Sequence, residues 1–122
     1  MDGISELKYN GRVIIVNIQR FNRDRARSAH DGTMLLEDIE LEGVDAPFKA
    51  TWGFLEENSE MKGNPHPDEE VYVIIKGSGV VFVGEEDRTV EGGDLVVIPS
   101  NEHHSLCSGK DGPLLWAALR WD

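Results

Sequence analysis

Cysteine is nearly absent from this sequence, which contains only Cys107. A single thiol cannot form an internal disulfide, and this fits a reducing cytoplasm. The sequence also lacks an apolar run long enough to cross a bilayer. Residues 1–6 do not show a basic segment followed by an apolar one, so we expect no secretory signal. These features predict a cytoplasmic protein that does not act at a membrane.

Basic residues are scarce as well, with 12 Lys and Arg against 23 Asp and Glu and a net charge of −11. Nucleic acids and anionic membranes both require a basic surface, so we expect neither as a partner. An anionic small molecule is not excluded. Four of the basic residues gather at Arg20, Arg23, Arg25 and Arg27. They form either a solvated loop or a flap that steers anions toward a pocket.

The chain instead contains many short apolar segments, separated by Gly and Pro, and no amphipathic helical pattern. Its 122 residues predict a single domain, 1–122, with a sizeable core. The predicted strands cover residues 12–18, 34–41, 49–55, 71–75, 80–83, 88–90, 95–98, 103–107 and 114–121. This pattern predicts an all-β sandwich or a closed jelly-roll barrel. Residues 1–32, with a strand buried on both sides and a long Arg-rich loop, lead into it.

The stretch 63–77 joins a group of polar side chains to the most regular strand signal in the sequence. Asn64 and His66 each precede a proline, which favours extended backbone and excludes a helix. On one straight strand His66 and Glu70 would lie about 13 Å apart, too far to share an ion. The chain must therefore turn between them, and residues 67–69 are good turn formers. We expect Glu70 to open the strand that follows.

Spacing around this stretch is regular. Six residues separate Glu70 from Gly77, and three separate His66 from Glu70. Asn64 lies two positions before His66, and Asn58 precedes Asn64 with five residues between them.

A second regular group lies further along the chain. Five residues separate Gly93 from Pro99, and Asn101 follows two positions later. Two residues then lead to His104, and three more to Ser108. Together the two groups resemble the two motifs of the cupin superfamily, in the order that the family requires. The resemblance covers about half the chain. Asn58 and Asn101 occupy glycine positions, and asparagine tolerates the left-handed backbone that such turns need.

The resemblance implies a double-stranded β-helix, the jelly-roll cupin barrel, and a divalent metal site. The family commonly binds its metal through three histidines and one glutamate. The corresponding positions here are His66, Glu70 and His104, with Asn64 in place of the remaining histidine. Two histidines and one carboxylate suit Fe(II), and Mn, Zn and Ni are alternatives. Asn64 would add a weak carbonyl ligand, hold a water, or do neither.

Other side chains are placed by strand alternation. Tyr72 shares the face of Glu70, so we expect it in the pocket, as packing or as a substrate contact. His103 points away from His104 and is expected at the surface or rim. Trp52 and Phe54 are predicted core residues, and Cys107 a buried structural thiol.

Three functions fit these residues. The first is a mononuclear metal enzyme acting on a small polar metabolite, of dioxygenase, isomerase, decarboxylase or cyclase type. The second is a non-catalytic cupin that binds or senses a sugar or an organic acid, with a degenerate or empty metal site. The third is a metal-free enzyme that uses a His66–Glu70 pair as general base. We also expect a homodimer, because the strand at 13–18 could extend a neighbour's sheet.

Overall fold

The computed structural model describes residues 6–9 and 12–122. Within these residues every regular element is a strand. In chain order the strands are β1 (Glu6–Tyr9), β2 (Arg12–Ile15), β3 (Arg27–Ala29), β4 (Met34–Asp38), β5 (Lys49–Leu55), β6 (Glu60–Gly63), β7 (Glu69–Lys76), β8 (Ser78–Val83), β9 (Glu86–Glu91), β10 (Leu95–Ile98), β11 (His104–Ser108) and β12 (Leu114–Trp121). The described part of the chain therefore has no helix able to cross a membrane.

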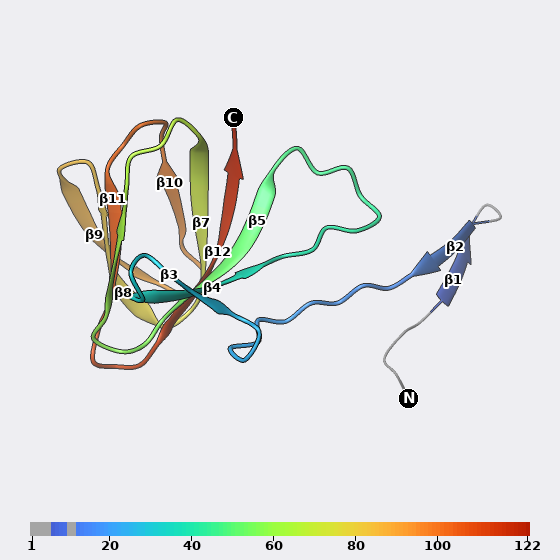
Figure 1. The fold of residues 1–122 in the computed structure, drawn as a ribbon, viewed down its shortest axis with the longest axis horizontal. Coiled ribbons are helices and arrows are strands. Elements are labelled where there is room, and N and C mark those ends of the chain that lie inside the picture. The colour runs from blue at the N-terminus through green and yellow to red at the C-terminus, as the bar shows by residue number, and fades with distance from the viewer. Residues whose placement is uncertain (1–5, 10–11) are drawn as a thin grey trace.

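Two antiparallel sheets form the barrel, and Figure 1 shows them facing each other. One has six strands in the order β10-β7-β12-β5-β4-β3, and the other has four in the order β6-β11-β8-β9. This arrangement confirms the predicted all-β jelly roll. The hairpin of β1 and β2 is a separate two-stranded sheet, which Figure 1 shows at the end of an extended segment away from the barrel.

Alternating side chains from both sheets fill the space between them. Strand β7 points Tyr72 and Ile74 inward, and β12 points Leu114 and Trp116 toward them. Leu106 on β11 closes the core from the opposite sheet and is fully buried. Because strand side chains alternate between faces, the same strands also carry polar residues into the barrel at their open ends.

Several predicted strand boundaries are wrong. The strand predicted over 12–18 ends at Ile15, and the prediction that it is buried on both sides is wrong at Val16 and Ile18, which are 38% and 64% exposed. The strand predicted over 34–41 ends at Asp38. The predicted loop before residue 32 contains β3, and β6 was not predicted. Both missed strands are short and polar, so pairing with a neighbour forms them rather than their own apolar pattern.

Candidate metal centre

A cavity of about 590 Å³ opens between the two sheets. Its inner part is apolar, with Met61 and Trp116 among the lining side chains, and its mouth is polar. His66, Glu70 and His104 line the same cavity and come from three different segments. Glu70 lies at the start of β7, His104 opens β11 on the opposite sheet, and His66 lies in the connection between β6 and β7.

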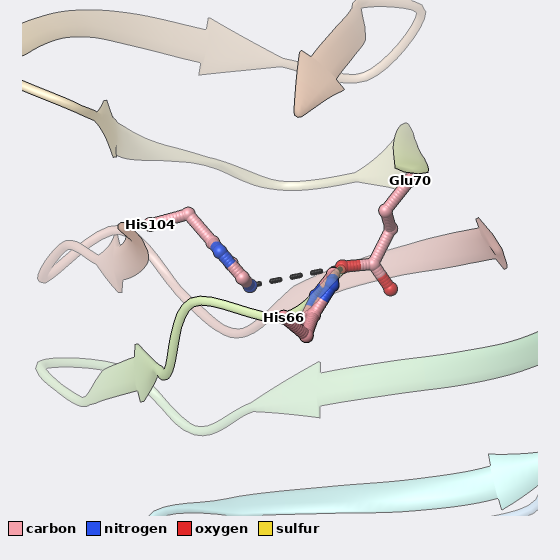
Figure 2. Close-up of side chains that lie close together, drawn as sticks. All are labelled: His66, Glu70 and His104. Atoms are coloured by element: carbon pink, nitrogen blue, oxygen red, sulfur yellow. Dashed lines mark hydrogen bonds and ion pairs between the residues drawn. The ribbon is translucent and has the colours of Figure 1, made fainter. Parts of the chain in front are cut away.

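The three side chains converge, as Figure 2 shows. One ligand atom from each lies within 4.8 Å of the others. Nε2 of His66 is 3.3 Å from Oε1 of Glu70, and Nε2 of His104 is 3.7 Å from the same oxygen. The two imidazole rings meet edge to face, with centroids 5.1 Å apart. Glu70 and His104 are buried, while the His66 side chain is 24% exposed toward the cavity.

Backbone carbonyls determine which nitrogen of each histidine carries the proton. Nδ1 of His66 lies 2.9 Å from the carbonyl of Asp68, and Nδ1 of His104 lies 3.2 Å from that of Glu102. A carbonyl can only accept, so both Nδ1 atoms must donate. When the rings are neutral, each Nε2 therefore presents a lone pair toward Glu70. Two lone pairs and a carboxylate facing one another repel unless a cation or a proton lies between them.

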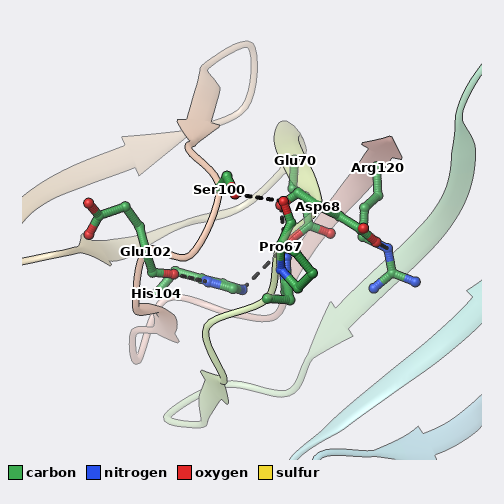
Figure 3. Close-up of polar contacts among 8 residues, drawn as sticks. Pro67, Asp68, Glu70, Ser100, Glu102, His104 and Arg120 are labelled. Carbon is green, nitrogen blue, oxygen red and sulfur yellow. Dashed lines mark hydrogen bonds and ion pairs between the residues drawn. The ribbon is translucent and has the colours of Figure 1, made fainter. Parts of the chain in front are cut away.

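The segment that carries His66 is held against the turn before β11. The backbone N–H of Asn101 donates to the carbonyl of His66 at 2.7 Å. The hydroxyl of Ser100 donates to the carbonyl of Pro67, also at 2.7 Å (Figure 3). Asn101 has a φ of 62° and Asn58 a φ of 54°, so both adopt the left-handed conformation expected from the glycine positions they occupy. These contacts join the two predicted motifs at one place.

Gly63, the last residue of β6, lies against the ring of His104. A Cβ atom there would lie 2.4 Å from Nε2 and 2.6 Å from Cδ2 of that ring. Only glycine therefore leaves the imidazole in its present position.

Burial dominates the electrostatics of the site. It lowers the pKa of His104 below the ordinary value, against the opposing effects of the Glu102 carbonyl and the Glu70 carboxylate. Burial also raises the pKa of Tyr72 well above its usual value, and the negative charge of Glu70 adds to the effect. The unprotonated imidazole and the neutral phenol are thus both favoured. They are the forms able to ligate a metal and to donate a hydrogen bond.

The remaining predicted residues divide between cavity and surface. Tyr72 is 4% exposed and lines the cavity beside His104, with ring centroids 6.1 Å apart. Asn64 lines the cavity at its exposed edge. His103 is exposed, as expected. Cys107 is half-buried, so the prediction of a buried thiol is wrong.

Residues 20–25 lie on the outside of the barrel. Phe21 stacks on Phe54 at 5.3 Å, and Arg23 lies over the same ring. Nε of Arg25 contacts the carboxylate of Glu37 at 2.7 Å and holds the pKa of that group below its usual value. Phe54 is thus half-buried on the outer face, as is Trp52, rather than in the core.

Three basic residues lie at the cavity mouth, Arg27, Lys49 and Arg120, and of these only Arg27 was considered as a functional residue, in the anion-steering flap. Of these, only Arg27 belongs to the Arg-rich segment. Lys49 and Arg120 belong to neither sequence motif. Only the pairing of β12 with β5 and with β7 brings them into the same row as Glu70.

The family model of the Cupin domain matches residues 55–119, more than half of the chain. No curated protein sequence matches it. A Cupin 2 conserved barrel domain protein from Salinispora arenicola has a similar structure, with a TM-score of 0.75, 19% identity, and 88% of this chain and 89% of that chain covered. A Photorhabdus luminescens protein has a TM-score of 0.74 and 22% identity, with coverage of 86% and 87%.

A third similar structure is the polyketide cyclase RemF from Streptomyces resistomycificus, with a TM-score of 0.67 and 17% identity. The alignment covers 85% of this chain and 79% of the cyclase. At these identities the structural likeness establishes the fold alone.

Proposed function

This chain belongs to the cupin family, and from that premise we propose that it is a mononuclear metal enzyme acting on a small polar metabolite. His66, Glu70 and His104 would hold one divalent ion, with Fe, Mn, Zn and Ni as candidates. The reaction would be a dioxygenation, isomerisation, decarboxylation or cyclisation. The likeness to a polyketide cyclase supports an enzymatic use of this scaffold.

One observation carries the proposal: the Nδ1 protons of both histidines are directed at backbone carbonyls. This leaves both Nε2 lone pairs and the Glu70 carboxylate aimed at the same small space. Histidine ligands of protein metal sites use the same arrangement, because a second bond at the far nitrogen orients the ring. A His66–Glu70 general base alone would leave the approach of His104 unexplained.

A bound divalent ion would act as a Lewis acid and would bind an oxygen of the substrate. The chain's own residues would do the rest. His66, Glu70 and His104 would fill three positions and leave others open toward the cavity. Tyr72, kept neutral by burial, would donate a hydrogen bond from its hydroxyl to a substrate oxygen. The apolar inner wall around Trp116 would exclude water from the inner part of the cavity.

Metal uptake tests the proposal, because the chain offers a matched pair of adjacent histidines. We expect the wild-type protein and His103→Ala to bind about one ion per chain after loading with Fe, Mn, Zn or Ni, and His104→Ala to bind none. His103 is exposed and His104 is buried in the cluster. Elemental analysis after gel filtration gives the stoichiometry. Equal uptake by both variants, or none by the wild type, would remove the proposal.

The second candidate is a non-catalytic cupin that binds or senses a small sugar or organic acid. The position of Asn64 favours it, since this residue stands where the family places a ligand histidine and lies at the exposed edge of the cavity. Thermal stabilisation by such ligands, with no product formed in the presence of metal, would support this function. Metal-dependent turnover of the same ligand would eliminate it.

We further propose that the chain acts as a single-domain homodimer in the cytoplasm. The lone cysteine supports the compartment. Support for the dimer comes from the exposed apolar side chains of β10, where Leu95 is 58% and Val97 63% exposed. Light scattering on the eluting protein tests the assembly, and a monomer at micromolar concentration would contradict it.

A further inference from the structure

The ligand carboxylate Glu70 belongs to a charged row that crosses three neighbouring strands. Glu70 on β7 pairs with Arg120 on β12, and Arg120 pairs with Lys49 on β5. Directly paired residues lie on the same face of a sheet, about 5 Å apart at Cβ. Both basic residues line the cavity mouth. Two positive charges therefore stand at the level of the candidate metal centre, on the strands that adjoin it.

Within the described residues these two cations make a single ion pair. Nε of Arg120 contacts Asp68 at 3.2 Å (Figure 3), and its two terminal amino groups donate no hydrogen bond in the described part of the chain. Lys49 has no carboxylate within 4.0 Å in the same part of the chain, and Asp38 at the mouth pairs with Arg27 instead. Like charges paired directly across strands are destabilising, so an anion between them would stabilise the mouth.

The cavity becomes less polar below this row. The next cross-strand row is Tyr72, Ala118 and Thr51, which offers two hydroxyl groups around a small side chain. The row below it is Ile74, Trp116 and Gly53, and it is apolar. The Trp116 indole occupies the space that a Gly53 side chain would need, with 2.3 Å to an added Cβ. The wall therefore changes from cationic to hydroxyl-bearing to apolar with depth.

From this order of rows we propose that the ligand of the cavity is an organic acid. Its carboxylate would lie between Arg120 and Lys49 at the mouth, and its apolar body would extend toward Trp116. The free amino groups of Arg120 form a fork that matches the two oxygens of a carboxylate. This inference rests on the proposed function in so far as a metal would be present in the cavity. Binding of the carboxylate itself depends on Arg120 and Lys49.

The test compares hexanoate with hexanamide, which has the same chain and no charge, by calorimetric titration of the metal-loaded protein. We expect hexanoate to bind at least tenfold more tightly. Arg120→Gln should weaken hexanoate binding roughly tenfold or more and leave hexanamide binding unchanged. The control is Arg88→Gln, which removes an exposed arginine on β9 that does not line the cavity. Lys49→Gln provides a second variant if Arg120→Gln melts early.

Equal binding of the two probes by the wild type would overturn the inference, as would hexanoate binding that Arg120→Gln and Lys49→Gln leave unchanged. The same titration with chelator separates this result from failure of the metal site. A protein that takes up no metal but still prefers hexanoate, in an Arg120-dependent way, would contradict the proposed function and uphold the organic acid. The preference for hexanoate could instead disappear with chelator while Arg120→Gln has no effect in the metal-loaded protein. The carboxylate would then bind to the metal alone, and the inference would be overturned.

Discussion

Substitution of Gly63 by alanine is the smallest change that should disable the candidate metal centre. The residue lies in a regular strand, so alanine suits its backbone. Its new methyl group would lie 2.4 Å from Nε2 of His104, the atom that faces Glu70. The chain otherwise keeps all three candidate ligands.

The size of the effect follows from these distances. Ordinary contact between a carbon and a ring atom begins near 3.4 Å, so the imidazole must move by about 1 Å. Metal–ligand distances tolerate only about 0.2 Å, so a shift of this size removes one ligand. Inserting a methyl group into a packed site costs about 1 to 3 kcal/mol of folding stability. We expect Gly63→Ala to lose at least tenfold in metal affinity and to unfold at lower denaturant concentration.

Two measurements check this expectation: metal affinity by competition with a coloured chelator, and urea unfolding of the metal-free protein. Gly109→Ala is the matched control, since an added Cβ there meets no atom within 4 Å. It should bind metal normally and unfold like the wild type or slightly later. If Gly63→Ala binds metal as tightly as Gly109→Ala, His104 is not the ligand that we infer.

Three further predictions concern folding stability and proton binding. Burial lowers the pKa of His104 below 6.5, so the unfolded chain takes up a proton on this residue at higher pH than the folded chain does. The free energy of unfolding should therefore fall as the pH drops through 6.5 and level off below the pKa of the folded state. Urea unfolding at a series of pH values measures this loss, and His104→Gln should reduce it. The Ser108 hydroxyl accepts a 3.0 Å hydrogen bond from the Ser59 N–H. Ser108→Ala should therefore lose about 1 to 3 kcal/mol of folding stability, measured by calorimetry. Unchanged metal uptake by this variant would exclude damage to the metal site. Burial raises the pKa of Tyr72 well above 10.0. Of the two tyrosines in the chain, one should therefore ionise only at a pH well above 10 in an ultraviolet titration, and Tyr72→Phe should abolish this step. Ionisation of both tyrosines near pH 10 would contradict the burial.

The fold and the candidate ligands were predictable because they depend on spacing along the chain. Prolines 65 and 67 exclude a helix through His66, and residues 67–69 let the chain turn before Glu70, so that both side chains face one point. The left-handed conformations of Asn58 and Asn101 were also predictable, since asparagine is the residue that best replaces glycine there.

The cation row at the cavity mouth was not predictable in the same way. Arg120 and Lys49 are 71 positions apart, and they become neighbours only through the register of β12 on β5. A register shift of one residue would turn either side chain to the outer face, and no local pattern specifies that register. The positions of residues 20–25 depend similarly on tertiary contacts, because the Phe21–Phe54 stack draws them to the outer face of the barrel.

A crystal structure of the zinc-loaded protein, with anomalous scattering recorded at the metal edge, would show whether His66, Glu70 and His104 hold one ion together. We predict one ion about 2.0 to 2.2 Å from Nε2 of His66, Nε2 of His104 and a carboxylate oxygen of Glu70, with both Nδ1 atoms still donating to backbone carbonyls. An ion held elsewhere, or a cluster that binds no ion at saturating zinc, would show that these three side chains do not form a metal site.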